Sequence, residues 1–121
     1  MKSRLVCILL IVASCQTHAA TVDQLVKVCV AHDAISWLAC STYVNGVFET
    51  LRGLTVQGVL RTDHAQGAFA ICPPENIAKG DIRAIAVSYL RKVSSEHPES
   101  VDQSAALLIA VALHDAFPCN E

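Results

Sequence analysis

The cysteines are the feature that most limits how this chain can fold. Six of its 121 residues are cysteines, and whether they pair depends on the compartment in which the protein folds. Two of them, Cys7 and Cys15, lie within the first 20 residues. The other four are spread over the rest of the chain: Cys29, Cys40, Cys72 and Cys119. The N-terminal residues therefore have to be interpreted before the cysteines are counted.

The N-terminus has the pattern of a signal peptide. Lys2 and Arg4 precede an uncharged apolar run, residues 5–13, about half as long as the roughly 20 residues that span a bilayer. Small residues follow, and we expect cleavage after Ala19 or Ala20. The sequence thus predicts a signal peptide at 1–20, a single domain at 21–121, and export to the periplasm.

A second processing site competes with this one. Val12-Ala13-Ser14-Cys15 resembles a bacterial lipobox, in which the cysteine becomes the lipidated first residue of the mature protein. Both routes lead out of the cytoplasm. No other stretch is apolar enough to cross a membrane, so we expect a soluble domain or one held by a lipid anchor on Cys15.

Without the leader, four cysteines remain, and an even number in a small exported domain indicates two disulfides with three alternative connectivities. A zinc site is the weaker alternative because the cysteines are 11, 32 and 47 residues apart, with no C-x-x-C pair. We favour Cys29–Cys40, which a helix hairpin would bring together. The second pair is then Cys72–Cys119, since both residues lie beside prolines at helix-breaking boundaries.

The spacing of the apolar residues predicts an all-α fold, a small disulfide-stapled bundle of four to five helices. Thr21 and Gln24 form a capping box for the first helix, and Asp33 can cap the second. Gly46 lies inside the second helix and predicts close packing against a neighbour. No segment alternates with a period of two.

The second half of the chain is predicted to hold two more helices. Residues 54–71 indicate a loop with at most one short helix, and residues 82–93 follow a clear helical stripe. Residues 94–99 form a polar loop with Pro98. Ser100 and Gln103 then resemble a second capping box, and the last stripe ends at Pro118.

Composition excludes two classes of protein. A chain that is 53% hydrophobic and 17% charged is not intrinsically disordered. The formal charge is −2 (9 − 11), and removal of Lys2 and Arg4 makes it −4 (7 − 11). Because no basic surface is expected, nucleic acid is not a predicted partner.

No motif for catalysis, a cofactor or a metal is recognisable. The histidines lack partners at metal-ligand spacing, and His114 beside Asp115 is interpreted as a solvated helix end. The aromatic residues are assigned to the core rather than to a ligand platform: Trp37, Tyr43, Tyr89 and Phe117. The residues alone therefore predict an exported binding protein that is not an enzyme.

An ordered set of motifs resembles the Rap/Tai family of type VI secretion immunity proteins. The motifs are Cys40-x-x-Tyr43-x-x-Gly46-Val47, Ile71-Cys72-Pro73, Tyr89-Leu90, His97-Pro98 and Phe117-Pro118-Cys119. Ser41-Thr42 stand where the family usually has a glycine, and Pro73-Pro74 is a further departure. The resemblance implies a periplasmic homodimer that binds a cognate peptidoglycan amidase effector and occludes its active site.

Two segments are candidates for insertion into the amidase. The first is the polar loop, with Ser94, Ser95, Glu96, His97 and Glu99, and the second is the stretch 52–64, with Arg61 and Asp63. Each could equally be a plain connector. The alternative functions are a small periplasmic stress chaperone and an envelope lipoprotein.

Overall fold

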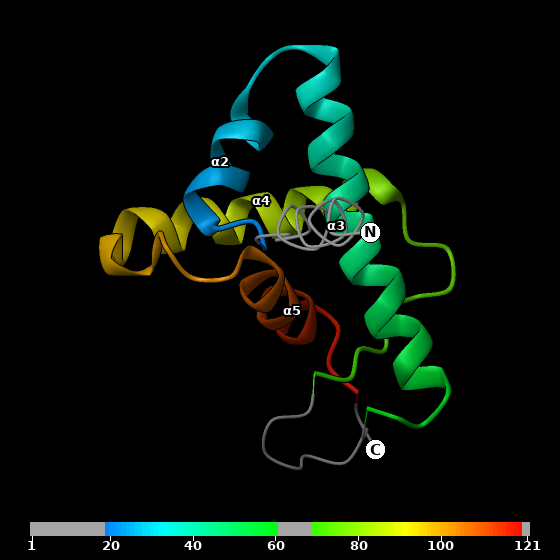
Figure 1. The fold of residues 1–121 in the computed structure, drawn as a ribbon. Coiled ribbons are helices and arrows are strands. Elements are labelled where there is room, and N and C mark those ends of the chain that lie inside the picture. Colours follow the sequence, from blue (N-terminus) through cyan, green and yellow to red (C-terminus); the bar gives the residue numbers. More distant parts are fainter. Residues whose placement is uncertain (1–18, 61–68, 120–121) are drawn as a thin grey trace, which may run out of the picture.

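The computed structural model describes residues 19–60 and 69–119. This part of the chain contains four α-helices and one 3-10 helix (Figure 1). Their bounds are α2 Val22–Val30, α3 Ala34–Val56, α4 Lys79–Glu96, η1 Pro98–Ser100 and α5 Ala105–Ala116. The predicted all-α fold with two disulfides is confirmed.

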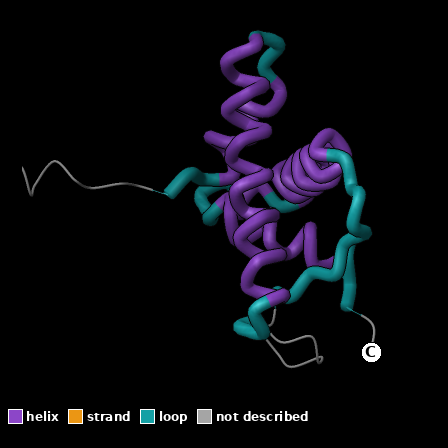
Figure 2. The backbone as a smooth tube through the Cα atoms, turned by 90° about the vertical axis from the view of Figure 1, so that its right-hand side faces the viewer, coloured by secondary structure: helices purple, strands orange, loops and turns teal. Residues whose placement is uncertain are grey.

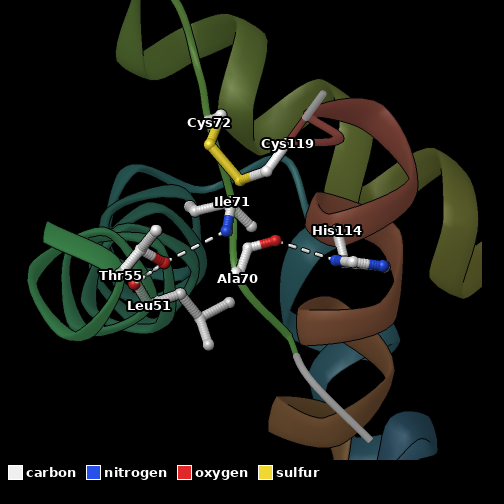
Figure 3. The surroundings of a disulfide bond; sticks show 7 residues. All are labelled: Leu51, Thr55, Ala70, Ile71, Cys72, His114 and Cys119. Carbon is white, nitrogen blue, oxygen red and sulfur yellow. Dashed lines mark hydrogen bonds between the residues drawn. A yellow bond between two sulfur atoms is a disulfide. The ribbon is translucent and has the colours of Figure 1, made fainter. Parts of the chain in front are cut away.

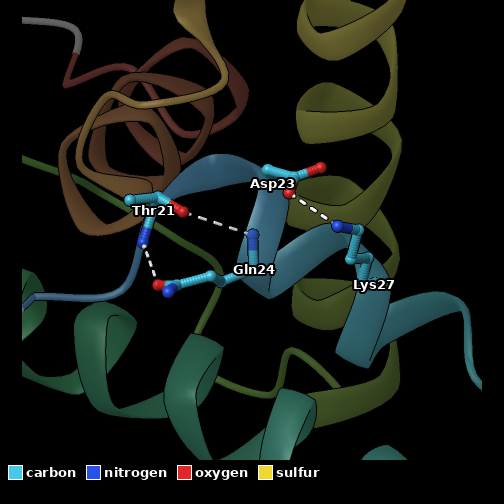
Figure 4. A network of polar contacts seen from close by, with 4 residues as sticks. All are labelled: Thr21, Asp23, Gln24 and Lys27. Carbon is cyan, nitrogen blue, oxygen red and sulfur yellow. Dashed lines mark hydrogen bonds and ion pairs between the residues drawn. The ribbon is translucent and has the colours of Figure 1, made fainter.

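Helix α2 begins at the predicted capping box (Figure 4). The Thr21 hydroxyl accepts the Gln24 amide at 3.3 Å, and the Gln24 side chain accepts the Thr21 amide at 3.0 Å. The Val22 amide donates to the Gln103 carbonyl, and the Ala105 amide donates to the Ala20 carbonyl, each at 3.0 Å. These bonds place the beginning of α2 beside the beginning of α5.

Helix α3 begins at the predicted cap but ends later than expected. The Asp33 carboxylate accepts the Ser36 amide at 2.8 Å, and the helix continues to Val56, so the expected loop at 54–71 is wrong at its beginning. Gly58 follows the helix with a φ of 72°, a left-handed conformation that glycine adopts without strain. Helix α3 therefore ends at a glycine in the left-handed conformation, which is a common way for a helix to end.

Two expectations for α3 are wrong. A Cβ added to Gly46 would have no atom within 4 Å, so this glycine packs against nothing in the described residues. Trp37 is not in the core, because 54% of it is exposed. Tyr43 and Tyr89 are half-buried, and Phe117 is buried with its ring 6.3 Å from that of Phe48.

Helix α4 contains the predicted stripe, but it does not end at Ser94. It runs to Glu96 and ends before Pro98, because a residue preceding proline is pushed out of the helical conformation. His97 accordingly has φ −130° and ψ 72°. The predicted loop is therefore the last turn of α4 followed by η1.

Helix α5 is capped by Ser104, and the expected capping box at Ser100 is wrong. The Ser104 hydroxyl accepts the Leu107 amide at 3.5 Å. Ser100 instead ends η1, and its hydroxyl donates to the His97 carbonyl at 2.7 Å. Pro98 begins the 3-10 turn, and this turn delays the start of α5.

The second disulfide, Cys72–Cys119, holds a non-helical segment between α3 and α5 (Figure 3). The Ile71 amide donates to the Thr55 hydroxyl at 3.1 Å, and His114 Nδ1 donates to the Ala70 carbonyl at 2.8 Å. The interpretation of His114 as a solvated helix end is therefore wrong. Figure 2 shows this segment running beside the C-terminal residues.

The core lies where the four helices meet. It is built from aliphatic side chains and one aromatic pair, and its largest fully buried members are Phe48, Ile71, Ile82, Leu90, Ile109 and Leu113. In the described residues no helix is long and apolar enough to cross a membrane.

The two disulfides should differ in how much they stabilise the fold. On the chain-entropy model, a bridge across 47 residues contributes about 4 kcal/mol and one across 11 residues about 3 kcal/mol. We expect Cys72→Ala/Cys119→Ala to lower the free energy of unfolding in urea more than Cys29→Ala/Cys40→Ala does. Unchanged unfolding midpoints for either double variant would contradict this assignment.

Candidate partner-binding surface

The first predicted segment forms a closed turn at the end of α4. Ser94 is half-buried, and Ser95 and Glu96 are exposed on the last turn of the helix. The amide and the hydroxyl of Ser100 both donate to the His97 carbonyl, at 2.9 Å and 2.7 Å, and close the turn from inside. We call residues 94–100 the acidic turn.

His97 and Glu99 interact on the outside of the acidic turn. The Nδ1 atom of His97 lies 3.2 Å from Oε1 of Glu99, and both side chains are exposed. The backbone amide of Glu99 itself, and then His97, hold the pKa of the Glu99 carboxyl below its ordinary value. Glu99 is therefore an anion at neutral pH, and it points to solvent together with Glu96.

The second predicted segment is only partly described. Arg61 and Asp63 lie outside the described residues, as does Cys15. The part that is described, up to residue 60, ends α3 and exposes Val56 and Val59, at 82% and 63%. The structure therefore brings together the residues of the acidic turn but does not test Arg61 and Asp63.

A third surface was missed by the sequence analysis. Four of the seven large apolar side chains that are exposed in the described residues lie between positions 30 and 38. They are Val30 at 43%, Ile35 at 82%, Trp37 at 54% and Leu38 at 61%. We call residues 30–38 the α2–α3 corner, which forms the top of the molecule in Figure 1.

The corner is exposed because α2 is too short to cover the first turns of α3. Cys40 is the first buried residue of α3, and the residues before it extend beyond the core. Trp37 lies three residues before Cys40, and this spacing made it resemble the core stripe. Two features of the sequence indicate this exposure. Only a few residues separate α2 from α3, and a short apolar cluster directly follows the Asp33 cap.

Arg83 of α4 supports the corner from below. One of its terminal nitrogens donates to the Cys29 carbonyl at 3.0 Å, and its guanidinium lies 5.6 Å from the centre of the Trp37 ring. The Nε atom of Arg83 is buried without a partner among the described residues. Arg83 therefore joins the end of α2, the beginning of α3 and the second turn of α4.

A groove of about 750 Å³ runs between the corner and α4. Its walls are mainly apolar, with Val30, Trp37 and Val87 as the larger side chains, and Arg83 and Arg91 add positive charge. His32 and Asp33 complete its charged and titratable lining. The Asp33 carboxylate is engaged in capping α3.

The groove and the acidic turn lie along one face of α4. Arg83, Val87 and Arg91 are separated by four residues each, and residues at this spacing share a helix face. Ser95 is the next residue in the series, and it belongs to the acidic turn. The acidic turn, which the sequence predicts, therefore lies one helical turn beyond the groove.

Comparison with known protein families agrees with the resemblance expected from the sequence. The family model of Rap1a immunity proteins matches residues 21–119. The chain belongs to this family. No curated protein and no solved structure matches it.

The matched residues of this Rap1a-family protein include all four described cysteines and the whole candidate surface. Within residues 19–60 and 69–119, no three His, Cys, Asp or Glu side chains gather so that they could hold a metal ion. The surface in this part of the chain presents exposed apolar side chains, two arginines and an acidic turn.

The cap of α3 should make part of the stability depend on pH. The Ser36 amide, which donates to the Asp33 carboxylate, lowers the pKa of this carboxyl. A carboxyl with a lowered folded pKa stabilises fully above its ordinary pKa and loses this contribution as the pH falls through the folded value. We expect Asp33→Asn, which still accepts the amide but does not titrate, to show a smaller fall in Tm between pH 7 and pH 2 than the wild type. Parallel Tm profiles would contradict a role of this carboxylate.

Proposed function

We propose that this protein is an exported immunity protein that binds a peptidoglycan amidase delivered by type VI secretion and occludes its active site. The observation that carries the proposal is the match to Rap1a immunity proteins over residues 21–119. An immunity protein acts by binding its toxin, and such inhibition needs shape and charge rather than a catalytic group. The exposed surface along α4 offers both.

Export is supported by the disulfides and by the position of the family match. Disulfides persist in oxidising compartments such as the bacterial periplasm, and this chain has two. The match begins at residue 21, directly after the predicted leader at 1–20. The mass of the mature N-terminus distinguishes cleavage after Ala20 from lipidation of Cys15.

The acidic turn is the element that we propose to enter the amidase cleft. Glu96, His97 and Glu99 are exposed at the end of α4, and the hydrogen bonds of Ser100 fix the backbone beneath them. A fixed turn loses little conformational entropy when it binds. Its carboxylates would face a groove that holds the positively charged histidine of a Cys/His pair. The segment with Arg61 and Asp63 is the second element proposed for insertion.

A homodimer is also part of the proposal. A groove of about 590 Å³ between α3 and α5 has three small residues in its lining, Gly46, Ala106 and Ala110. Leu107, the neighbour of Ala106, is 49% exposed. Glycine inside a helix is unfavourable by about 1 kcal/mol relative to alanine. Open space at Gly46 suits the close approach of a helix from a second copy.

The alternative function is that of a small periplasmic chaperone, and the exposed apolar side chains at both ends of α3 favour it. A chaperone would bind many unfolded proteins weakly. An immunity protein would bind one amidase tightly and in a fixed stoichiometry. The two functions are therefore distinguished by titration of a folded amidase and of a reduced, unfolded client protein.

The test of the proposed function is an inhibition assay. The purified protein is mixed in turn with each cysteine amidase encoded in the genome that carries its gene, and cleavage of peptidoglycan peptides is followed. We expect complete inhibition of one amidase at a 1:1 ratio of subunits. Inhibition of none of them, together with suppression of client aggregation, would support the chaperone instead.

The acidic turn is tested by a double variant with a matched control. We expect Glu96→Ala/His97→Ala to weaken inhibition of the amidase by about tenfold or more, the range of interface hot spots. The control is Glu75→Ala/Asn76→Ala, two adjacent exposed residues that precede α4, and it should inhibit like the wild type. Equal inhibition by both variants would show that the acidic turn does not insert.

A further inference from the structure

We infer that the α2–α3 corner is a second docking surface for the amidase, and that it receives a segment in which a carboxylate lies beside an apolar side chain. The carboxylate would meet Arg83 and Arg91, and the apolar side chain would pack on Trp37. The inference rests on the proposed function, because it assigns a further contact to the same partner.

In the described part of the chain, the lining of the groove carries two arginines and one carboxylate, that of Asp33. Among the described residues, no carboxylate lies within ion-pair distance of Arg83 or Arg91. Arg83 is half-buried and is held by the neutral carbonyl of Cys29 and the ring of Trp37. The carboxylate that lines the groove, Asp33, caps α3. A cation with so little compensation favours an anionic group from outside, and arginine binds carboxylates with two parallel hydrogen bonds.

The apolar part of the corner has the composition of an interface core. Tryptophan and arginine are the side chains most enriched among residues that dominate binding energy. Here Trp37 is half-exposed although its ring is positioned by Arg83. Leu38 lines a smaller pocket together with Trp37 and is 61% exposed, and Ile35 of the same corner is 82% exposed.

The corner is fixed before any partner binds. The Cys29–Cys40 disulfide joins α2 to α3 with a Cα–Cα distance of 5.0 Å. Asp33 caps α3, and Arg83 binds the Cys29 carbonyl in the last turn of α2. Because three independent contacts restrain these few residues, binding would order little that is not already ordered.

A second copy of this chain fits the corner less well than the amidase does. A symmetric pair uses the same patch on both subunits. Corner-to-corner pairing would therefore bring two grooves of the same net positive charge into one interface, and this repulsion is unfavourable. The small-residue groove at Gly46 carries no such charge.

The position of the corner gives it a distinct role. Arg91 is the last groove residue of α4 and lies one helical turn before Ser95, so the groove and the acidic turn are neighbours along this helix. The amidase would be gripped at Trp37 and Arg91 while the acidic turn covers its catalytic residues. Affinity would then depend on the corner, and occlusion would depend on the turn.

The experiment uses two variants with matched controls. Ile35→Asp is compared with Asn76→Asp, which adds the same charge at an exposed position before α4, outside every proposed contact. Arg91→Glu is compared with Lys92→Glu, its exposed neighbour that does not line the groove. All four changes are at exposed positions, and circular dichroism checks that each variant is folded.

The probe is the amidase that the wild-type protein inhibits, and the readout is Kd by calorimetry. We expect Ile35→Asp and Arg91→Glu each to raise the Kd about tenfold or more, and both controls to change it less than about twofold. Equal effects in the variants and their controls would overturn the inference. So would a wild-type dimer that Ile35→Asp converts to a monomer, because the corner would then bind a second copy.

A spectroscopic measurement tests contact at the corner directly. Trp37 is the single tryptophan of the chain, so protein labelled with 5-fluorotryptophan gives one 19F resonance. Addition of the unlabelled amidase should shift this resonance, and an unshifted resonance at saturation would overturn the inference.

The proposed function and the corner assignment fail in different ways. If the wild-type protein inhibits no amidase, the proposed function fails and the corner assignment fails with it, whereas inhibition without any effect at the corner refutes the corner assignment alone.

Discussion

The Cys29–Cys40 disulfide is the contact on which the exposed surface of this protein depends. Helix α2 has nine residues, and a helix of this length is marginal by itself. The bridge attaches its end to α3 at the first residue of α3 that is buried. The first turns of α3 therefore extend beyond the core, and Ile35, Trp37 and Leu38 are presented to solvent on a rigid support.

Arg83 gives the same support from the other side. Its side chain connects the carbonyl of Cys29 to the ring of Trp37, so three helices meet at one guanidinium. The second disulfide, Cys72–Cys119, acts at the opposite end of α3, where it holds a non-helical segment against α5. With both ends of α3 restrained, a small core is sufficient, and the surface along α4 is free to bind a partner.

The parts of the fold that could be predicted are those determined by local sequence. The caps at Thr21 and Asp33 depend on residues three positions apart, and the stripe of α4 depends on spacing along a single helix. The disulfide pairs followed from cysteines at helix boundaries. In each case the decisive partner lies near in sequence or is another cysteine.

The errors concern what covers a helix and where it stops. Trp37 matches the core spacing, but among the described helices no other extends far enough to cover it. Gly46 was expected to touch a neighbour, and that side of α3 is open. Pro98 moved the end of α4 and the start of α5 away from the expected serines. The outcomes at Trp37 and Gly46 depend on the lengths and positions of neighbouring helices, which periodicity does not encode, and they explain why the corner was missed.

Family membership and the surface along α4 support one account, in which a Rap1a-family protein covers the active site of an amidase with an acidic turn and holds the enzyme with a fixed apolar corner. The most direct test of occlusion is the rate at which iodoacetamide alkylates the catalytic thiol of the amidase. The account predicts that one equivalent of this protein protects the thiol almost completely. A thiol that reacts at the rate of the free enzyme while the complex is fully formed would contradict it.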